Sequence, residues 1–242
     1  MRAMDKYKNT GMIVLGISII LGFTSLGYFI SKATFDFKSF ERSVTVKGLA
    51  EQEHLADIVI WPVQFTEASN SLDGVYESLD GSAERVKEFL LSRGISENEI
   101  SFSTPLLTDR SAQRYGGNEN YQYRYIASQT ATIYSENVES VRNMMSELVE
   151  LGKQGVTLSG NEYEVRPEYI FTRLNEIKPE MIEQATIEAR QVAEKFAEDS
   201  NSRLGKIKTA SQGQFSIMDR DNNNPHIKKV RVVSTIVYYL SD

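Results

Sequence analysis

The first regularity in the chain is an uninterrupted apolar run near its N-terminus. Residues 11–30 (GMIVLGISIILGFTSLGYFI) carry no charged side chain. A helix of this length spans about 30 Å, at ~1.5 Å per residue, which matches the hydrocarbon core of a bilayer. The pattern therefore predicts one transmembrane helix, followed by a chain that is patterned like a folded domain.

Basic residues lie mainly on one side of this run. Arg2, Lys6 and Lys8 precede it, and Lys32 alone follows it closely. An excess of Lys and Arg marks the side of a membrane that stays in the cytoplasm. We therefore predict a single-pass protein of the cell (inner) membrane in four parts. These are residues 1–10 in the cytoplasm, residues 11–30 as an uncleaved signal-anchor, residues 31–42 as a polar and aromatic linker, and residues 43–242 as a periplasmic or otherwise extracytoplasmic domain.

Two other interpretations of the apolar run stay open. Residues 31–33 (Ser-Lys-Ala) loosely resemble a cleavage site, so the run could belong to a cleaved signal peptide. The apolar region of a cleaved signal is usually ~7–15 residues long, which is shorter than the run here. The second alternative is a helix buried in the core of a globular protein.

After the linker, strand and helix patterns alternate. Apolar residues at three- and four-residue spacing predict helices over residues 69–93, from residue 135 to Gly152, and over residues 179–203. Strands are predicted over residues 43–49, 55–66, 100–108, 121–134, 156–171, 207–215 and 229–240. This order predicts an α+β fold, in which a mixed, largely antiparallel sheet is covered by three amphipathic helices.

Two of these segments carry more specific expectations. Residues 55–66 are apolar on both faces, which is typical of a central strand covered on both sides. Pro62 cannot donate to a strand ladder, so we expect a bulge or a sheet edge at that position. The third helix has a small, alanine-rich buried stripe that would let it lie close to a sheet. Its members are Ile182, Ala185, Ala189, Val192, Ala193 and Phe196.

The composition excludes some classes of function. The chain has 242 residues, no cysteine and a net charge of −6. The 32 N-terminal residues hold four basic side chains and one acidic one, so the rest of the chain has a more negative net charge than the whole. An acidic body is a poor match for nucleic acid. The absence of cysteine removes disulfides, thiolate catalysis and cysteine-based zinc sites together.

Aromatic residues supply the best candidate for a binding site. Tyr121, Tyr123 and Tyr125 alternate, so on a strand they would share one face, and Arg114 and Tyr115 lie shortly before them. Tyrosine is enriched at protein interfaces, and a row of tyrosines could bind another subunit or a glycan. The ordinary alternative is aromatic packing beneath a helix.

A calcium site is not expected from the acidic segment near the C-terminus. Asp219, Asp221 and Asn223 begin like a calcium-binding loop, but Asn224 and Val230 occupy the places of the required Gly and Glu. We therefore interpret this segment as a solvated turn.

The remaining titratable candidates also have ordinary explanations. His54 and His226 are the only histidines and fit no catalytic or metal-binding motif, so both are expected at the surface. Asp57 stands at the mouth of an apolar strand and is expected to cap a turn. We therefore predict no catalytic residue, no cofactor and no metal site.

Three stretches in this order resemble the SIMPL family of extracytoplasmic bacterial proteins. They are Val44–Ala50 with Ala56–Ile60, then Leu90–Ile95 leading to Ile100–Phe102, then the alanine pattern of residues 185–197 with Leu204-Gly205-Lys206. The resemblance implies an α+β fold, export, a tendency to form homo-oligomers and a loose association with envelope or oxidative stress. It implies no known catalytic residues. Many members have a cleaved signal, and the long apolar run here departs from that.

Together these observations favour an envelope protein that acts through self-association or partner binding and not through catalysis. Its expected partners are the membrane through residues 11–30, further copies of itself, and an envelope protein or a glycan, with no nucleic acid. Two other classes stay open. One is a carboxylate-dependent hydrolase or lyase, which needs two acidic groups about 5–9 Å apart in a pocket. The other is a module that binds a peptide or a solute at a sheet edge.

Overall fold

The computed structural model describes residues 2–39, 42–112, 122–160 and 165–241 of the chain. By internal contacts the chain forms two compact units, which are described here one at a time. Unit 1 comprises Met1–Ala50, Glu180–Phe215 and Val232–Asp242; unit 2 comprises Glu51–Pro179 and Ser216–Arg231.

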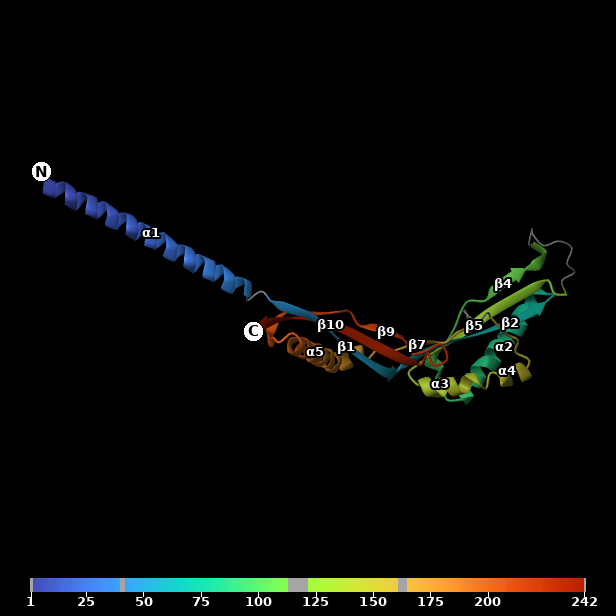
Figure 1. Ribbon diagram of the computed structural model, residues 1–242. Coiled ribbons are helices and arrows are strands. Elements are labelled where there is room, and N and C mark those ends of the chain that lie inside the picture. The colour runs from blue at the N-terminus through green and yellow to red at the C-terminus, as the bar shows by residue number, and fades with distance from the viewer. Residues whose placement is uncertain (1, 40–41, 113–121, 161–164, 242) are drawn as a thin grey trace. The chain divides into compact units, whose positions relative to one another are not determined.

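The N-terminal segment is one helix, α1 (Arg2–Ser39) (Figure 1). It continues through most of the segment expected to be a linker. Within it, Gly16–Thr34 is long and apolar enough to cross a membrane, and none of this stretch is buried by the rest of the chain. Phe23 is 71% exposed and Ile20 is 64% exposed. A membrane anchor and a signal sequence would both have this length and composition.

In unit 1, an alanine-lined helix packs closely against a sheet. The sheet has the order β1 (Ser43–Leu55), β10 (Ile227–Ser241), β8 (Arg203–Gln212). Strand β9 (Ser216–Asp219) pairs with Lys228–Arg231, the part of β10 that belongs to unit 2. The helix is α5 (Leu174–Asp199), and its residues Ala185, Ala189 and Ala193 are fully buried. A β-carbon on Gly48 of β1 would overlap the carbonyl oxygen of Ala185. The expected close approach of helix and sheet is therefore confirmed.

The buried stripe of α5 is narrower than its sequence indicated. Its fully or nearly fully buried members follow a strict four-residue spacing: Met181, Ala185, Ala189, Ala193 and Ala197. Val192 is 50% exposed and Phe196 is 55% exposed, so their predicted burial is wrong. Residues at four-residue spacing form a row that is inclined to the helix axis. The alanine row of α5 contacts the sheet, and side chains on either side of that row point away from the sheet.

Unit 2 is built on a six-stranded sheet with helices on one face (Figure 1). Its central strands, β2 (Ile58–Ser69) and β5 (Tyr125–Ser135), pair antiparallel over eleven positions. The other strands are β3 (Ile100–Phe102), β4 (Leu106–Asp109), β6 (Leu158–Ser159) and β7 (Glu168–Ile170). The first two pair with β5, and the last two pair with the opposite edge of β2.

The helices of this unit are α2 (Leu72–Ser92), α3 (Val138–Met145) and α4 (Val149–Lys153), with short 3-10 helices at Glu97–Glu99 and Arg110–Ala112. Ser71 caps α2, where its side chain accepts the amide of Gly74. Between α2 and the sheet lies the main apolar core, which includes Val59, Trp61, Phe65, Val75, Leu79, Leu90 and Ile133. The α+β class and the largely antiparallel pairing are confirmed.

Strand β2 is covered on one face only, which corrects the expectation of double coverage. Its odd-numbered residues from Val59 to Phe65 are buried, whereas the even-numbered residues between them are only half-buried. Pro62 meets the expectation of a sheet edge. It lies between the pairing of Gln64 with β6 and that of Ile60 with β7, where no described residue pairs with β2 on that side.

Several predicted elements are shorter or longer than expected. The strand predicted over residues 100–108 is two strands, β3 and β4, separated by a segment containing Pro105, which cannot donate to a ladder. The strand predicted over residues 156–171 is reduced to β6 and β7, with residues 161–164 outside the described part. The helix predicted from residue 135 is divided into α3 and α4, and β1 continues to Leu55.

Candidate functional site

The tyrosines singled out in the sequence do not form one row on a strand in the described residues. Tyr125 is the first residue of β5 and packs against the core of unit 2. Tyr123 precedes the strand and is 41% exposed. Arg114, Tyr115 and Tyr121 lie outside the described residues. A contact role for these five residues stays a prediction.

The segment next to these tyrosines is fixed by an ion pair. Arg124 donates from Nε to Asp109 Oδ1 at 3.2 Å and from Nη2 to Oδ2 at 2.9 Å. Its guanidinium also lies 4.8 Å from the centre of the Tyr125 ring. The hydrogen bonds from Arg124, and then those from Ser111, hold the pKa of Asp109 well below its usual range. These hydrogen bonds hold the segment in place. They also occupy the carboxylate oxygens of Asp109, which are therefore not free to act as a general acid or base.

Asp57 has a structural role, but its hydrogen-bond partners are distant in sequence and not those of the turn cap that was expected. Both of its carboxylate oxygens lie 3.0 Å from the amide nitrogen of Thr172, which donates to them, and Arg173 Nε donates at 3.1 Å. Burial alone would raise the pKa of Asp57, but the combined hydrogen bonds from Thr172 and Arg173 outweigh it and lower the pKa. Asp57 therefore ties the segment after β7 to the start of β2.

One of the two histidines is buried, so the prediction that both lie at the surface is wrong. His226 is 8% exposed, and its ring meets the edge of Tyr169 with a centroid distance of 6.0 Å. Its carbonyl oxygen accepts the amide of Ala56 at 2.8 Å. Burial, together with the charges of Arg142 and Arg220, lowers the pKa of His226. His54 is half-buried and stacks on Phe171 at 5.2 Å.

The acidic segment near the C-terminus is a hydrogen-bonded turn. Asp221 accepts the amides of Asn223 and Asn224 at 2.9 Å each, and Arg220 donates to it at 2.9 Å. The hydrogen bond from Arg220 comes first among the causes that lower the pKa of Asp221 to about 2. Within the described residues no group of three or more acidic or histidine side chains is arranged to hold a metal. The prediction of no metal site concerns the whole chain and stays a prediction.

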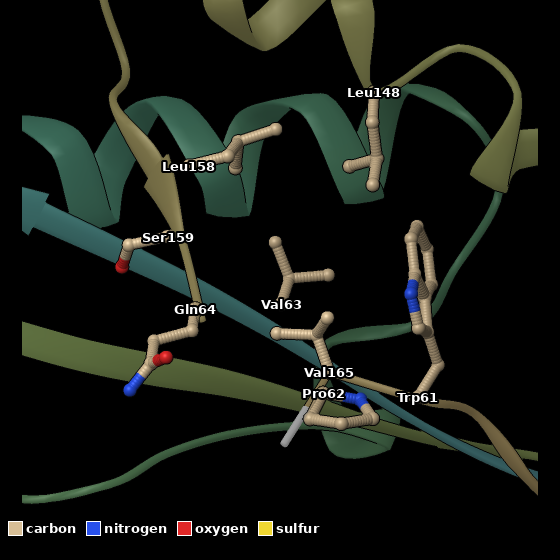
Figure 2. Close-up of a pocket in the computed structure, with 8 residues that line it drawn as sticks. All are labelled: Trp61, Pro62, Val63, Gln64, Leu148, Leu158, Ser159 and Val165. Atoms are coloured by element: carbon tan, nitrogen blue, oxygen red, sulfur yellow. The ribbon is translucent and has the colours of Figure 1, made fainter. Parts of the chain in front are cut away.

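A small apolar pocket opens beside the part of β2 that lies between its pairings with β6 and β7 (Figure 2). Its volume is about 120 Å³. Eight residues line it: Trp61, Pro62, Val63, Gln64, Leu148, Leu158, Ser159 and Val165. Sites for small molecules are usually ~300–1,000 Å³. The lining contains no carboxylate, so this pocket does not meet the requirement for carboxylate-pair catalysis.

A polar group beneath α2 was not anticipated from the sequence. Ser82 is fully buried and donates to Glu67 Oε1 at 2.5 Å, while Arg85 Nη2 donates to Ser82 at 2.9 Å. Arg85 Nε is buried and has no hydrogen-bond partner among the described residues. This group links α2 to β2 and lies within the helix-covered side of the sheet.

On the side of the six-stranded sheet away from the helices of unit 2, most residues of β2 and β5 are half-buried. We define the open face as the even-numbered residues of β2 and β5 that point away from the helices. The cross-strand pairs are Ile60 with Tyr134, Pro62 with Thr132, Gln64 with Thr130, and Thr66 with Ser128. None of these eight side chains is charged, and Tyr134 is 51% exposed. Leu106, 69% exposed, extends the face beyond Ser128.

The sequence contained a signal for this face that was overlooked. In residues 127–133 the apolar residues Ala127, Ala131 and Ile133 alternate with Ser128, Thr130 and Thr132, and only Gln129 interrupts the pattern. Such alternation is typical of a strand with one buried and one exposed face.

The comparisons with known proteins assign a family and no activity. The model of the family SIMPL, described as a protein of unknown function (DUF541), matches residues 44–235. No curated protein matches the chain. The matched range begins one residue into β1, ends within β10, and excludes α1.

Proposed function

The chain belongs to the SIMPL family, and from this membership and its fold we propose that it is a non-catalytic protein of the cell envelope. In this proposal residues 11–30 hold it in the inner membrane, and residues 43–242 lie outside the cytoplasm. The outer domain works by associating with further copies of itself or with an envelope partner. A role in defence against envelope or oxidative stress belongs to the same proposal.

The observation that carries this proposal is the exposure of α1. Nineteen residues, Gly16–Thr34, form a helix without any protein cover, and this stretch includes Ile20, Leu21, Phe23 and Phe29, each at least 64% exposed. Leaving the large apolar side chains of this stretch in water is strongly unfavourable, at roughly 25 cal/mol per Å² of apolar surface. A bilayer removes that penalty, and the charges of Arg2, Lys6 and Lys8 favour an N-terminus on the cytoplasmic side.

A non-catalytic role is supported by how the acidic groups are used. Asp57, Asp109 and Asp221 are each engaged by hydrogen bonds that lower the pKa of the carboxyl group. General acid catalysis at neutral pH needs the opposite, a carboxyl group with a raised pKa. The apolar pocket beside Trp61 offers no acidic group either.

The experiment that tests the proposal is cross-linking of the full-length chain in its native membranes with an amine-reactive reagent. The chain should sediment with the membranes and give cross-linked species at multiples of its own mass. A chain that stays monomeric at all reagent concentrations, and captures no other envelope protein, would refute the proposed mode of action.

A further inference from the structure

Resting on the proposed anchoring by α1, we propose that strand β8 of unit 1 is a second membrane contact, which binds the anionic phospholipid headgroups of the bilayer that α1 spans. The contact residues are basic. They come from β8 itself and from the position just before β1, and they are Arg42, Arg203, Lys206 and Lys208.

The acidity of the chain is unevenly distributed around β8. Helix α5 holds seven acidic and three basic side chains. The segment that follows it, residues 200–218, holds three basic side chains and no acidic one. An anionic surface would therefore repel α5 and attract β8, although the chain as a whole is acidic.

Strand β8 is open to solvent along most of its length. Every residue from Gly205 to Gln214 is exposed. Among the described residues no strand pairs with the outer edge of β8, and Arg203, Lys206 and Lys208 have no ion-pair partner there. Their charges are therefore available to an anionic partner.

The exposed apolar groups beside these charges suit a lipid interface. Ile207 lies between the two lysines and is 50% exposed, and Tyr239 on the neighbouring strand β10 is 39% exposed. The Nζ atom of Lys208 lies 5.4 Å from the centre of the Tyr239 ring. Tyrosine is enriched where membranes meet water, and lysine can lay its apolar stem along such a surface while its amine reaches the headgroups.

The chain itself keeps this end of the sheet close to α1. Two residues separate Ser39, the last residue of α1, from Arg42. Their Cα atoms are therefore within about 11 Å, at ~3.6 Å per residue, whatever the angle between helix and sheet. The carbonyl of Arg42 accepts the amide of Leu240 at 2.9 Å, and Ser241 pairs with Arg203. Arg42 and Arg203 therefore share the tethered end of the sheet, about 10 Å apart at ~4.8 Å per strand.

The tether is short enough for the headgroups to attract these residues. The apolar stretch of α1 ends at Thr34, five residues before Ser39. Arg42 is therefore at most about 19 Å from the hydrocarbon core, counting ~1.5 Å per helical residue and the extended tether. The headgroup region fills roughly 5–8 Å of this distance, and the field of its charges extends about 8 Å further at physiological salt.

The natural lack of cysteine allows a direct test. Thr209→Cys, next to Lys208 on β8, carries a fluorophore in the full-length chain, which is reconstituted in lipid nanodiscs. Some lipids carry a nitroxide on the headgroup, which quenches the fluorophore only at close range. Quenching should be much stronger in an equal mixture of phosphatidylglycerol and phosphatidylcholine than in phosphatidylcholine alone. About 1 M salt, which shortens the Debye length to about 3 Å, should remove the difference.

Removal of the charges tests the cause of the contact. Arg203→Gln, Lys206→Gln and Lys208→Gln are combined in the labelled chain. Each basic residue near an anionic surface favours contact by about fivefold, so the three changes together should weaken it about 100-fold. Quenching should then fall to its level in phosphatidylcholine.

The matched control removes positive charge from α5 instead. Arg190 and Lys195 pair with Glu194 and Asp199 at 2.8 Å each. Arg190→Gln with Lys195→Gln should leave quenching unchanged, because α5 is acidic and lies outside the proposed contact. Circular dichroism of each variant shows whether the fold is retained; all five positions are exposed, so it should be.

The outcomes separate this inference from the proposed anchoring. A chain that does not enter nanodiscs of either composition would refute the anchoring itself. A chain that enters them but is quenched equally in both lipids would overturn the role of β8. Lysine on an open strand edge would then serve only to hinder pairing with other strands. Quenching that survives the triple change, or falls equally in the α5 control, would overturn the role of β8 as well.

Discussion

The contact between β1 and α5 in unit 1 predicts that Gly48→Ala is strongly destabilising. A β-carbon at position 48 would overlap the carbonyl oxygen of Ala185 and lie 2.6 Å from the amide nitrogen of Ala189. Both obstacles are backbone atoms of α5, so no side-chain rotation can relieve the clash. The helix would have to move outward along the row in which Ala185 and Ala189 are fully buried.

The expected cost follows from that displacement. Overpacking a core by one methyl group usually costs about 1–3 kcal/mol, and backbone obstacles place this case at the upper end or above it. We therefore expect a loss of about 3 kcal/mol. For a domain of this size each kcal/mol lowers the melting temperature by about 2–4 °C, so the fall should be about 6–12 °C.

Thermal unfolding of the detergent-solubilised chain, followed by circular dichroism, measures this effect. Gly152→Ala is the matched control, because a β-carbon there meets no atom within 4 Å. Since alanine is favoured over glycine in a helix by about 1 kcal/mol, the control should melt at the same temperature or slightly higher. Equal melting temperatures for Gly48→Ala and the unaltered chain would refute the close packing of α5 on the sheet.

Three further predictions concern individual side chains. Phe196→Ala should change the free energy of unfolding by less than about 0.5 kcal/mol, because Phe196 is 55% exposed. Ala189→Leu should lower it by about 1–3 kcal/mol, because the larger side chain overpacks the contact with the sheet. Chemical denaturation of the two variants measures both free energies. The pKa of Asp57 is lower in the folded state than in the unfolded state. Its ionised carboxylate therefore stabilises the fold above the unfolded pKa of about 4, and this stabilisation is lost as the pH falls through the folded pKa. Asp57→Asn should therefore cost about 1–2 kcal/mol at pH 7 and reduce the loss of stability on acidification, and a stability profile identical to that of the unaltered chain would contradict this. The pKa of His226 is also lowered, so stability should fall as the pH drops below the unfolded value of about 6.5, and His226→Phe should flatten that decline between pH 7 and pH 5.

The local sequence pattern predicted the structure correctly where a single physical effect determines it. The uncharged run of residues 11–30 predicted an apolar helix, which the structure has as part of α1. Pro62 predicted a bulge or a sheet edge because it has no amide hydrogen to donate. In the structure it pairs with Thr132 of β5, and on its other side β2 has no partner there among the described residues.

The local sequence pattern did not predict burial correctly where burial depends on which other helix or strand packs against the segment. Val192 and Phe196 are apolar and fall near the buried stripe of α5, but the row that contacts the sheet is the four-residue alanine row. Residues 55–66 are apolar on both faces, yet whether a second layer covers the strand depends on chain segments far away in sequence. His226 is buried by Tyr169, which is 57 positions earlier in the chain and cannot be paired with it from sequence alone.

The tyrosines illustrate a related limit for the candidate site. Their alternation predicted a shared face only if residues 121–125 are a strand, and β5 begins at Tyr125. The open face, which β5 shares with β2, has no charged residue among its eight members and one tyrosine, Tyr134. Its significance depends on knowing that the helices cover the opposite side.

The central claim is that an apolar helix holds an acidic domain outside the cytoplasm, and labelling of intact cells tests it most directly. Gln154→Cys supplies a single exposed thiol in an otherwise cysteine-free chain. A membrane-impermeant maleimide should label this thiol in intact cells, and the labelled chain should sediment with the membranes at its full mass. Labelling only after lysis, or a labelled chain that is soluble and shortened at its N-terminus, would contradict the account.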